Sequence, residues 1–133
     1  MSLMTWSENY SVNINEVDDQ HQELFQLVNG LHESLSGDRA VIGEKLNGLI
    51  DFVVKHFATE EELMQANGYP DYEEHKKAHD NLVQQCADIQ AKFNAGEEEV
   101  TEEITAFVRD WLYSHIPNID KQYSPFLNEK GVE

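Results

Sequence analysis

Cysteine, positive charge and long apolar runs are scarce in this chain of 133 residues. Its single cysteine, Cys86, excludes an intramolecular disulfide and is typical of a reducing compartment. The chain has 9 lysines and arginines against 26 acids, giving a formal net charge of −17. That balance disfavours nucleic acid and anionic membrane surfaces as partners.

Membrane and export signals are also missing from the sequence. No apolar run approaches the roughly 20 residues of a membrane span. No positively charged start precedes an apolar stretch, so we see no secretory signal. We therefore expect a cytoplasmic protein without a membrane anchor, and its length suits a single domain over residues 1–133.

Four segments have the apolar spacing of amphipathic helices, and none alternates as a β-strand does. The helices are predicted over residues 19–36, 39–66, 71–93 and 101–115. The first three are expected to be capped by Asp18, Asp38 and Asp71, and Glu74 completes a capping-box spacing in the third. Short links favour an all-α fold, an up-down-up-down antiparallel four-helix bundle.

The two ends of the chain lack this helical period. Residues 1–17 are predicted to form an extended N-terminal arm that packs on the bundle of residues 18–116. The C-terminal segment, 117–133, contains two prolines and is expected to start irregularly and to dock through Tyr123, Phe126 and Leu127.

Histidines and acids fall at matching ends of the predicted helices. The starts of odd helices and the ends of even helices lie at the same end of an up-down bundle, which places these residues in one inward-facing layer: His21, His56, Glu60, His75, His79 and His115. Asp120 follows His115 by five residues, and Pro117 is expected to break or loosen the helix after His115, which would let Asp120 turn back toward that layer.

Seven ligands are too many for one ion of ordinary coordination number. They suit two metals, each with its own imidazoles and with carboxylates between them, and the absence of thiolate favours iron or manganese. Two octahedral ions sharing two carboxylates and a bridging oxygen would keep one position open, where dioxygen could bind. The alternative, core histidines satisfied by hydrogen bonds, would bury Glu60 and Asp120 without partners.

Other polar residues serve as comparisons. His32 is about 16 Å along the helix from His21, too far to share its site, and is interpreted as structural or exposed. Glu61 and Glu62 rotate off the face of Glu60 and are expected in solvent. Cys86 is interpreted as a small buried hydrophobe.

Motifs spread along nearly the whole chain resemble the hemerythrin family, and in particular the bacterial single-domain hemerythrins. They are Trp6 with VDDQHQEL (17–24), HFATEEELM (56–64), YPDYEEHKKAH (69–79) and WLYSHIPNIDKQY (111–123). The resemblance implies a four-helix bundle with a non-haem di-iron centre, bridged by an oxo or hydroxo group, that binds dioxygen reversibly.

Carried over residue by residue, the resemblance implies that His75, His79 and His115 hold one iron and that His21 and His56 hold the iron with the open position. Glu60 and Asp120 would bridge the two ions. An apolar wall for dioxygen is expected from Trp111, Leu112, Ile116 and Phe57, although Trp111 and Leu112 equally suit plain core packing.

Three functions fit this site. The first is reversible dioxygen binding for storage, transport or delivery to an oxygen-using enzyme. The second is sensing of oxygen, redox state or iron, a role that usually needs an attached output domain. The third is a di-iron oxidase, although such sites are typically richer in carboxylate, with Glu-x-x-His pairs. The histidine-rich ligand set favours binding over catalysis.

Overall fold

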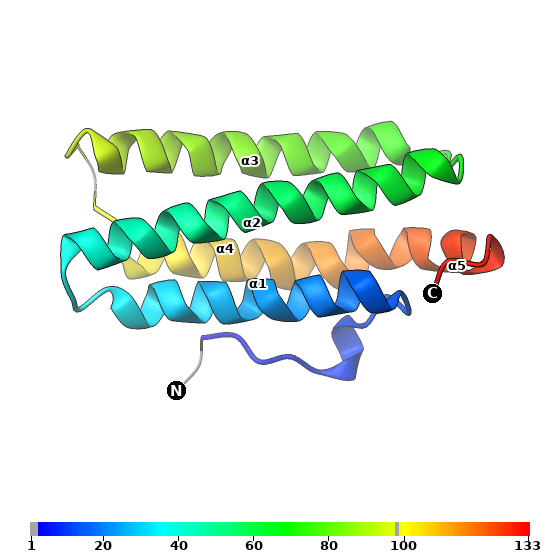
Figure 1. Ribbon diagram of the computed structural model, residues 1–133, viewed down its shortest axis with the longest axis horizontal. Helices are drawn as coiled ribbons and strands as arrows, with labels where there is room; N and C mark the ends of the chain where they lie inside the picture. The colour runs from blue at the N-terminus through cyan, green and yellow to red at the C-terminus, as the bar shows by residue number, and fades with distance from the viewer. Residues whose placement is uncertain (1–2, 98) are drawn as a thin grey trace.

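Four long helices run antiparallel and form an up-down-up-down bundle in the computed structural model, which describes residues 3–97 and 99–133 (Figure 1). They are α1 (Asn15–Ser34), α2 (Arg39–Ala66), α3 (Tyr72–Asn94) and α4 (Glu102–His115). The predicted four-helix bundle is confirmed, and these described residues contain no strand. None of the described helices is long and apolar enough to cross a membrane.

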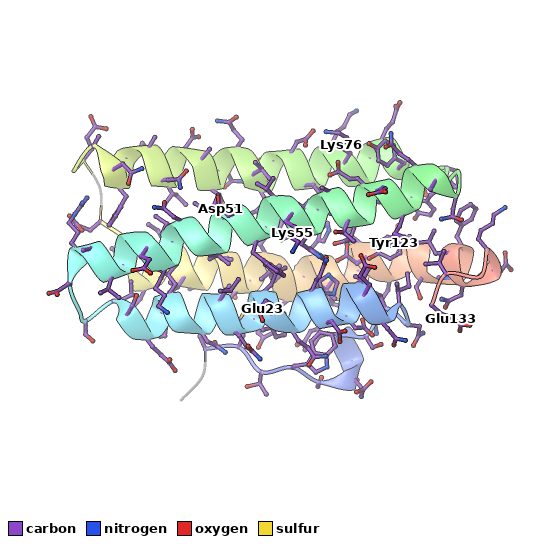
Figure 2. All side chains as sticks on the ribbon, in the orientation of Figure 1. Glu23, Asp51, Lys55, Lys76, Tyr123 and Glu133 are labelled. Atoms are coloured by element: carbon purple, nitrogen blue, oxygen red, sulfur yellow. The ribbon has the colours of Figure 1, made fainter. Side chains whose placement is uncertain are left out.

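Each helix turns an apolar stripe inward and a charged face outward. The stripe of α1 includes Leu24, Val28 and Leu31, all fully buried, and matches the predicted spacing. Charged side chains such as Glu23 and Asp51 point away from the bundle (Figure 2). Burying one such face per helix is what stabilises the bundle, since most helical stability in proteins comes from tertiary packing of an amphipathic face.

The helix starts differ from the prediction in where α1 begins and in how the helices are capped. α1 begins at Asn15, not at residue 19, and Asp18 lies inside it, accepting hydrogen bonds from Ser11 Oγ (2.6 Å) and the Val12 amide (2.8 Å). Asp18 therefore anchors the arm instead of capping the helix. Asp38 and Asp71 occupy the N-cap positions of α2 and α3, as predicted, but neither side chain makes a capping hydrogen bond, so the expected capping box with Glu74 is wrong.

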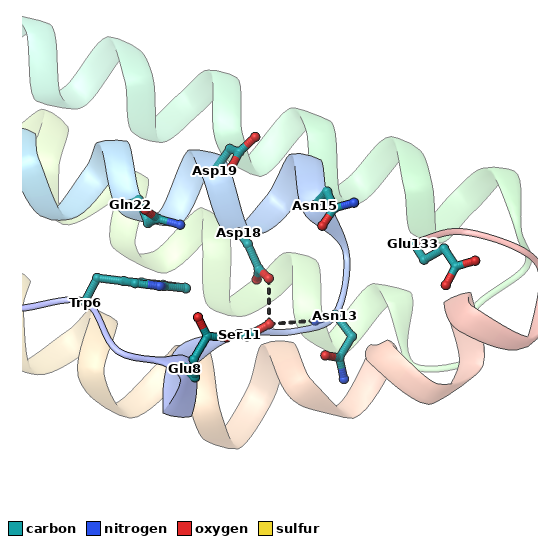
Figure 3. A pocket seen from close by; sticks show the side chains of 9 residues that line it. All are labelled: Trp6, Glu8, Ser11, Asn13, Asn15, Asp18, Asp19, Gln22 and Glu133. Carbon is teal, nitrogen blue, oxygen red and sulfur yellow. Dashed lines mark hydrogen bonds between the residues drawn. The ribbon is translucent and has the colours of Figure 1, made fainter.

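The N-terminal arm packs on the bundle as predicted, although it is not extended throughout. It includes a short 3₁₀ turn, η1 (Glu8–Tyr10), and buries Met4 and Val12. Between the arm and the start of α1 lies a polar surface hollow of about 540 Å³ (Figure 3). Acidic side chains line much of this hollow, which lies outside the buried layer of histidines.

The C-terminal segment is helical, which contradicts the expected irregular start. One π-helical turn, η2 (Ile116–Asp120), joins α4 directly to α5 (Lys121–Glu129). α5 therefore lies at the end of the bundle where α4 ends (Figure 1). Docking through Tyr123 and Leu127 is confirmed, since both are fully buried, and Phe126 packs partly buried beside them. Pro117 stands where α4 passes into η2; it has no amide hydrogen to donate to a carbonyl of the preceding turn, which favours a departure from regular α-helical bonding here.

Candidate metal centre

Four helices and one turn build a buried layer of imidazoles and carboxylates at one end of the bundle. The seven predicted ligands all lie in it, each at most 6% exposed: His21 from α1, His56 and Glu60 from α2, His75 and His79 from α3, His115 from α4 and Asp120 from η2. The antiparallel topology therefore brings together the residues that the sequence predicted at matching helix ends. Their role as metal ligands stays a prediction.

The π-helical turn explains how Asp120 joins this layer. On a regular α-helix, residues five apart point in different directions. In η2 the Lys121 amide donates to the Ile116 carbonyl, the i to i+5 bond of a π turn, which brings residues five apart over one another. Asp120 Oδ1 consequently lies 2.8 Å from Nε2 of His115. The helix therefore loosens after His115, one of the two predicted possibilities, and does not break; the widened turn aims the carboxylate.

The side chains divide into two adjoining groups that share one carboxylate. Within each group the potential ligand atoms lie within 4.8 Å of one another, and the groups are His75, His79, His115 and Asp120, and His21, His56, Glu60 and Asp120. Glu60 also approaches the first group, with Oε2 3.7 Å from Nε2 of His75. Two carboxylates therefore stand between three imidazoles on one side and two on the other.

Polar atoms that face the centre of the layer are unsatisfied within the described part of the chain. Nε2 of His21, His75, His79 and His115, Oε1 of Glu60 and Oδ1 of Asp120 are buried and have no hydrogen-bond partner. Some lie close together, as at 2.9 Å between His75 Nε2 and Asp120 Oδ1, but without hydrogen-bond geometry. Such atoms cost about 1–3 kcal/mol each. Cations would satisfy them, so the residues present fit a pair of metal ions.

Both carboxylates are held in their ionised form. Burial and the Asp120 charge raise the pKa of Glu60, but the imidazoles of His56 and His21 outweigh them and hold it below its ordinary value. Burial likewise opposes the ionisation of Asp120, yet His115, His21 and His75 keep its pKa well below the usual range. Two buried negative charges between imidazoles form an environment that favours cations.

The imidazoles respond in opposite directions. Burial lowers the pKa of His21, but the nearby carboxylates of Asp120 and Glu60 outweigh burial and raise that pKa to about 9. Burial dominates at His79, whose pKa is lowered despite Glu61. The carboxylates thus hold protons on some imidazoles in the metal-free protein, and a metal must displace those protons to bind.

Three contacts around the ligands were not predicted from the sequence. Gln20 Oε1 lies 2.7 Å from His56 Nδ1, and Glu61 Oε2 lies 3.1 Å from His79 Nδ1. Tyr123 donates its hydroxyl to Glu60 Oε2 at 2.8 Å. Glu61 is therefore not simply solvated, because the neighbouring α3 presents His79 to it. Its only sequence signal was its position beside Glu60.

Apolar and aromatic side chains surround the imidazoles. Phe57 stacks on the His79 ring at 3.8 Å between centroids, and Trp111 stacks on His115 at 4.2 Å. Leu112 and Ile116 are buried in the core. Phe57 and Trp111 thus each cover one imidazole of the group of three histidines, while the role of all four residues as a dioxygen wall stays a prediction.

The comparison residues behave as expected, apart from Glu61. His32 lies outside both groups, and its Nδ1 is 3.0 Å from Thr105 Oγ1, so its role is structural. Glu62 is exposed. Cys86 is 5% exposed, and burial raises the pKa of its thiol to about 11. The layer therefore contains histidine and carboxylate without thiolate.

The fold and this layer define a class: a helical-bundle protein with a buried site whose composition suits metal cations. The model of the hemerythrin HHE cation-binding domain matches residues 12–127. The chain is 51% identical over 130 residues to a bacteriohemerythrin of Methylococcus capsulatus, covering 96% of this chain and 99% of that protein. It is 33% identical over 126 residues to a hemerythrin-like protein of Naegleria gruberi, covering 95% of each.

Solved structures show the same relationship. A crystal structure of wild-type hemerythrin matches with a TM-score of 0.93 and 51% identity, covering 95% of this chain and 98% of that chain. The chain belongs to the hemerythrin family.

Proposed function

We propose that this protein binds dioxygen reversibly at a non-haem pair of iron ions and serves in oxygen storage, transport or delivery. The observation that carries the proposal is the pair of buried ligand groups that share Asp120 and contain no thiolate. Membership of the hemerythrin family supports the same function.

Each group has a distinct part in the proposed centre. His75, His79 and His115 would hold one iron, His21 and His56 would hold the other, and Glu60 and Asp120 would bridge them. Because it would have fewer imidazoles, the iron held by His21 and His56 would be the one with room for dioxygen. Ferrous iron bound there would supply the electrons that dioxygen takes up on binding and gives back on release.

The protein's own contribution is orientation and exclusion of water. The π-helical turn aims Asp120, and the Tyr123 hydroxyl fixes Glu60, so the two carboxylates are positioned before any ion arrives. Apolar side chains such as Leu112 and Ile116 would keep water from the centre, and a dry site favours release of intact dioxygen over irreversible oxidation. We propose binding, not catalysis, because imidazoles outnumber carboxylates in the ligand set.

The test is reconstitution with ferrous iron under argon, followed by cycles of air and argon. We expect two irons per chain by elemental analysis, and a visible absorption band that rises in air and falls when oxygen is removed. A reproducible stoichiometry of one iron, or a single irreversible change to a ferric spectrum, would overturn the proposal. His32→Ala is the matched control, because it removes an imidazole outside both groups.

A further inference from the structure

His79 is held from two sides by residues outside the ligand set. Its Nδ1 lies 3.1 Å from Glu61 Oε2, and its ring stacks on Phe57 at 3.8 Å with the planes 2° apart. Its Nε2 is buried and faces the layer without a partner. A donor at Nδ1 leaves the lone pair on Nε2, so the contact with Glu61 selects the tautomer that can ligate a metal.

The equivalent contact in the other group is neutral. His56 Nδ1 lies 2.7 Å from the amide oxygen of Gln20, and that amide donates in turn to Thr59 Oγ1 at 3.3 Å. Across residues 3–97 and 99–133, Glu61 is the one carboxylate outside the seven ligand residues that contacts a histidine of the layer. The two groups therefore differ in the charge behind their histidines.

Contact with solvent lowers the desolvation cost of placing the Glu61 carboxylate beside His79. Its side chain is 18% exposed, at the edge of a surface hollow of about 200 Å³ that Val54, Asp80 and Val83 also line. One oxygen can meet the imidazole while the other reaches water. A negative charge is thus placed next to a ligand without the large desolvation penalty of a fully buried carboxylate.

We propose that Glu61 is a positioning residue that sets the redox balance of the iron held by His75, His79 and His115. The inference rests on the proposed di-iron function. A carboxylate that accepts from Nδ1–H makes the imidazole a stronger donor through Nε2, and a stronger donor stabilises ferric over ferrous iron. The neutral Gln20 amide does not strengthen His56 as a donor to the same degree, so the two irons differ in how readily they give up an electron.

The test compares Glu61→Gln and Glu61→Ala with the control Glu62→Gln in iron-loaded protein. Glu62 is the exposed neighbour on α2, and its replacement removes the same charge. Removing such an outer partner typically costs 10–100-fold in metal affinity, and we expect this loss for Glu61→Ala in competition with a chelator. Glu61→Gln keeps an oxygen acceptor and should retain more of the affinity.

The reduction potential is the readout that a purely structural role would not move. We expect both Glu61 variants to raise the potential of one iron, with about a tenfold change in the ferric-to-ferrous ratio, or ~59 mV for one electron. Gln20→Glu should lower the potential of the other iron. Glu62→Gln should leave both potentials near the wild-type values.

Equal potentials in Glu61→Gln and Glu62→Gln would overturn the inference, since Glu61 would then act only as surface charge. A wild-type protein that still takes up two irons and cycles with oxygen would leave the proposed function standing in that case. A wild-type protein that binds no iron pair would overturn both. Circular dichroism of each variant checks the fold, and a folded Glu61→Ala with wild-type affinity and potential also refutes the assignment.

Discussion

The hydrogen bond from Tyr123 to Glu60 links α5 to the centre, and its removal tests how the site is held together. Tyr123→Phe deletes one hydroxyl and keeps the ring, which is fully buried against Tyr69 and His75. Because the ring stays, the change removes little beyond the 2.8 Å bond to Glu60 Oε2. Burial and the charges of Glu60 and Asp120 raise the pKa of Tyr123 well above its ordinary value, so the phenol stays a donor.

The expected loss follows from the charge on the acceptor. Hydrogen bonds to charged groups contribute about 1.5–3 kcal/mol, and the Glu60 carboxylate is ionised. For a domain of this size, a loss of that order lowers the melting temperature by roughly 5–12 °C. Iron affinity should fall as well, because Glu60 would no longer be fixed in the orientation that the centre needs.

The assay is thermal unfolding of iron-loaded protein followed by circular dichroism, with iron content measured before heating. Tyr72→Phe is the control, since it deletes a hydroxyl from a half-buried tyrosine on α3. A Tyr123→Phe protein that melts within a degree or two of that control would refute the reasoning. The hydroxyl would then contribute nothing to Glu60 beyond what water supplies.

Other variants and conditions test the remaining parts of the structure. Asp120→Ala should release both irons, because Asp120 lies in both ligand groups, whereas His32→Ala should keep both; elemental analysis decides, and one retained iron would contradict the shared role. Leu112→Asn should shorten the lifetime of the oxygenated form by admitting water, as followed in the visible spectrum, and an unchanged lifetime would remove Leu112 from the proposed wall. Cys86 should react slowly with a thiol reagent at pH 8 in folded protein and rapidly in denaturant, because burial raises its pKa from 9.0 to about 11. The unfolded thiol ionises first, so the stability linked to this group is complete below pH 9 and is lost as the pH rises toward about 11.

Much of the fold and of the candidate site could be predicted from local patterns in the sequence. The inward stripe of each helix follows from a period of 3.6 residues, and one face of α2 therefore presents both His56 and Glu60 to the core. Up-down topology then places odd starts beside even ends, which is why His21 and His115 were expected in one layer. These features depend on spacing along one helix and on short connections, and both can be determined directly from the sequence.

Contacts between helices depended on the tertiary structure. Rotation along α2 alone sends Glu61 toward solvent, and only the packing of α3 brings the outer nitrogen of His79 to it. Tyr123 reaches Glu60 across 63 residues because η2 and α5 continue α4 without a break. Asp18 tied down the arm instead of capping a helix, since Ser11 and Val12 lie against it in space.

The sequence by itself determined which side chains face inward and at which end of the bundle they gather, because helical period and chain direction are local properties. The tertiary structure decided which atoms of those side chains meet and what stands behind them. Such contacts join residues from different helices, and their distances depend on how the helices pack and on a single π-helical turn. The candidate ligand set is therefore predictable from spacing, while the groups placed behind its histidines are a property of the folded chain.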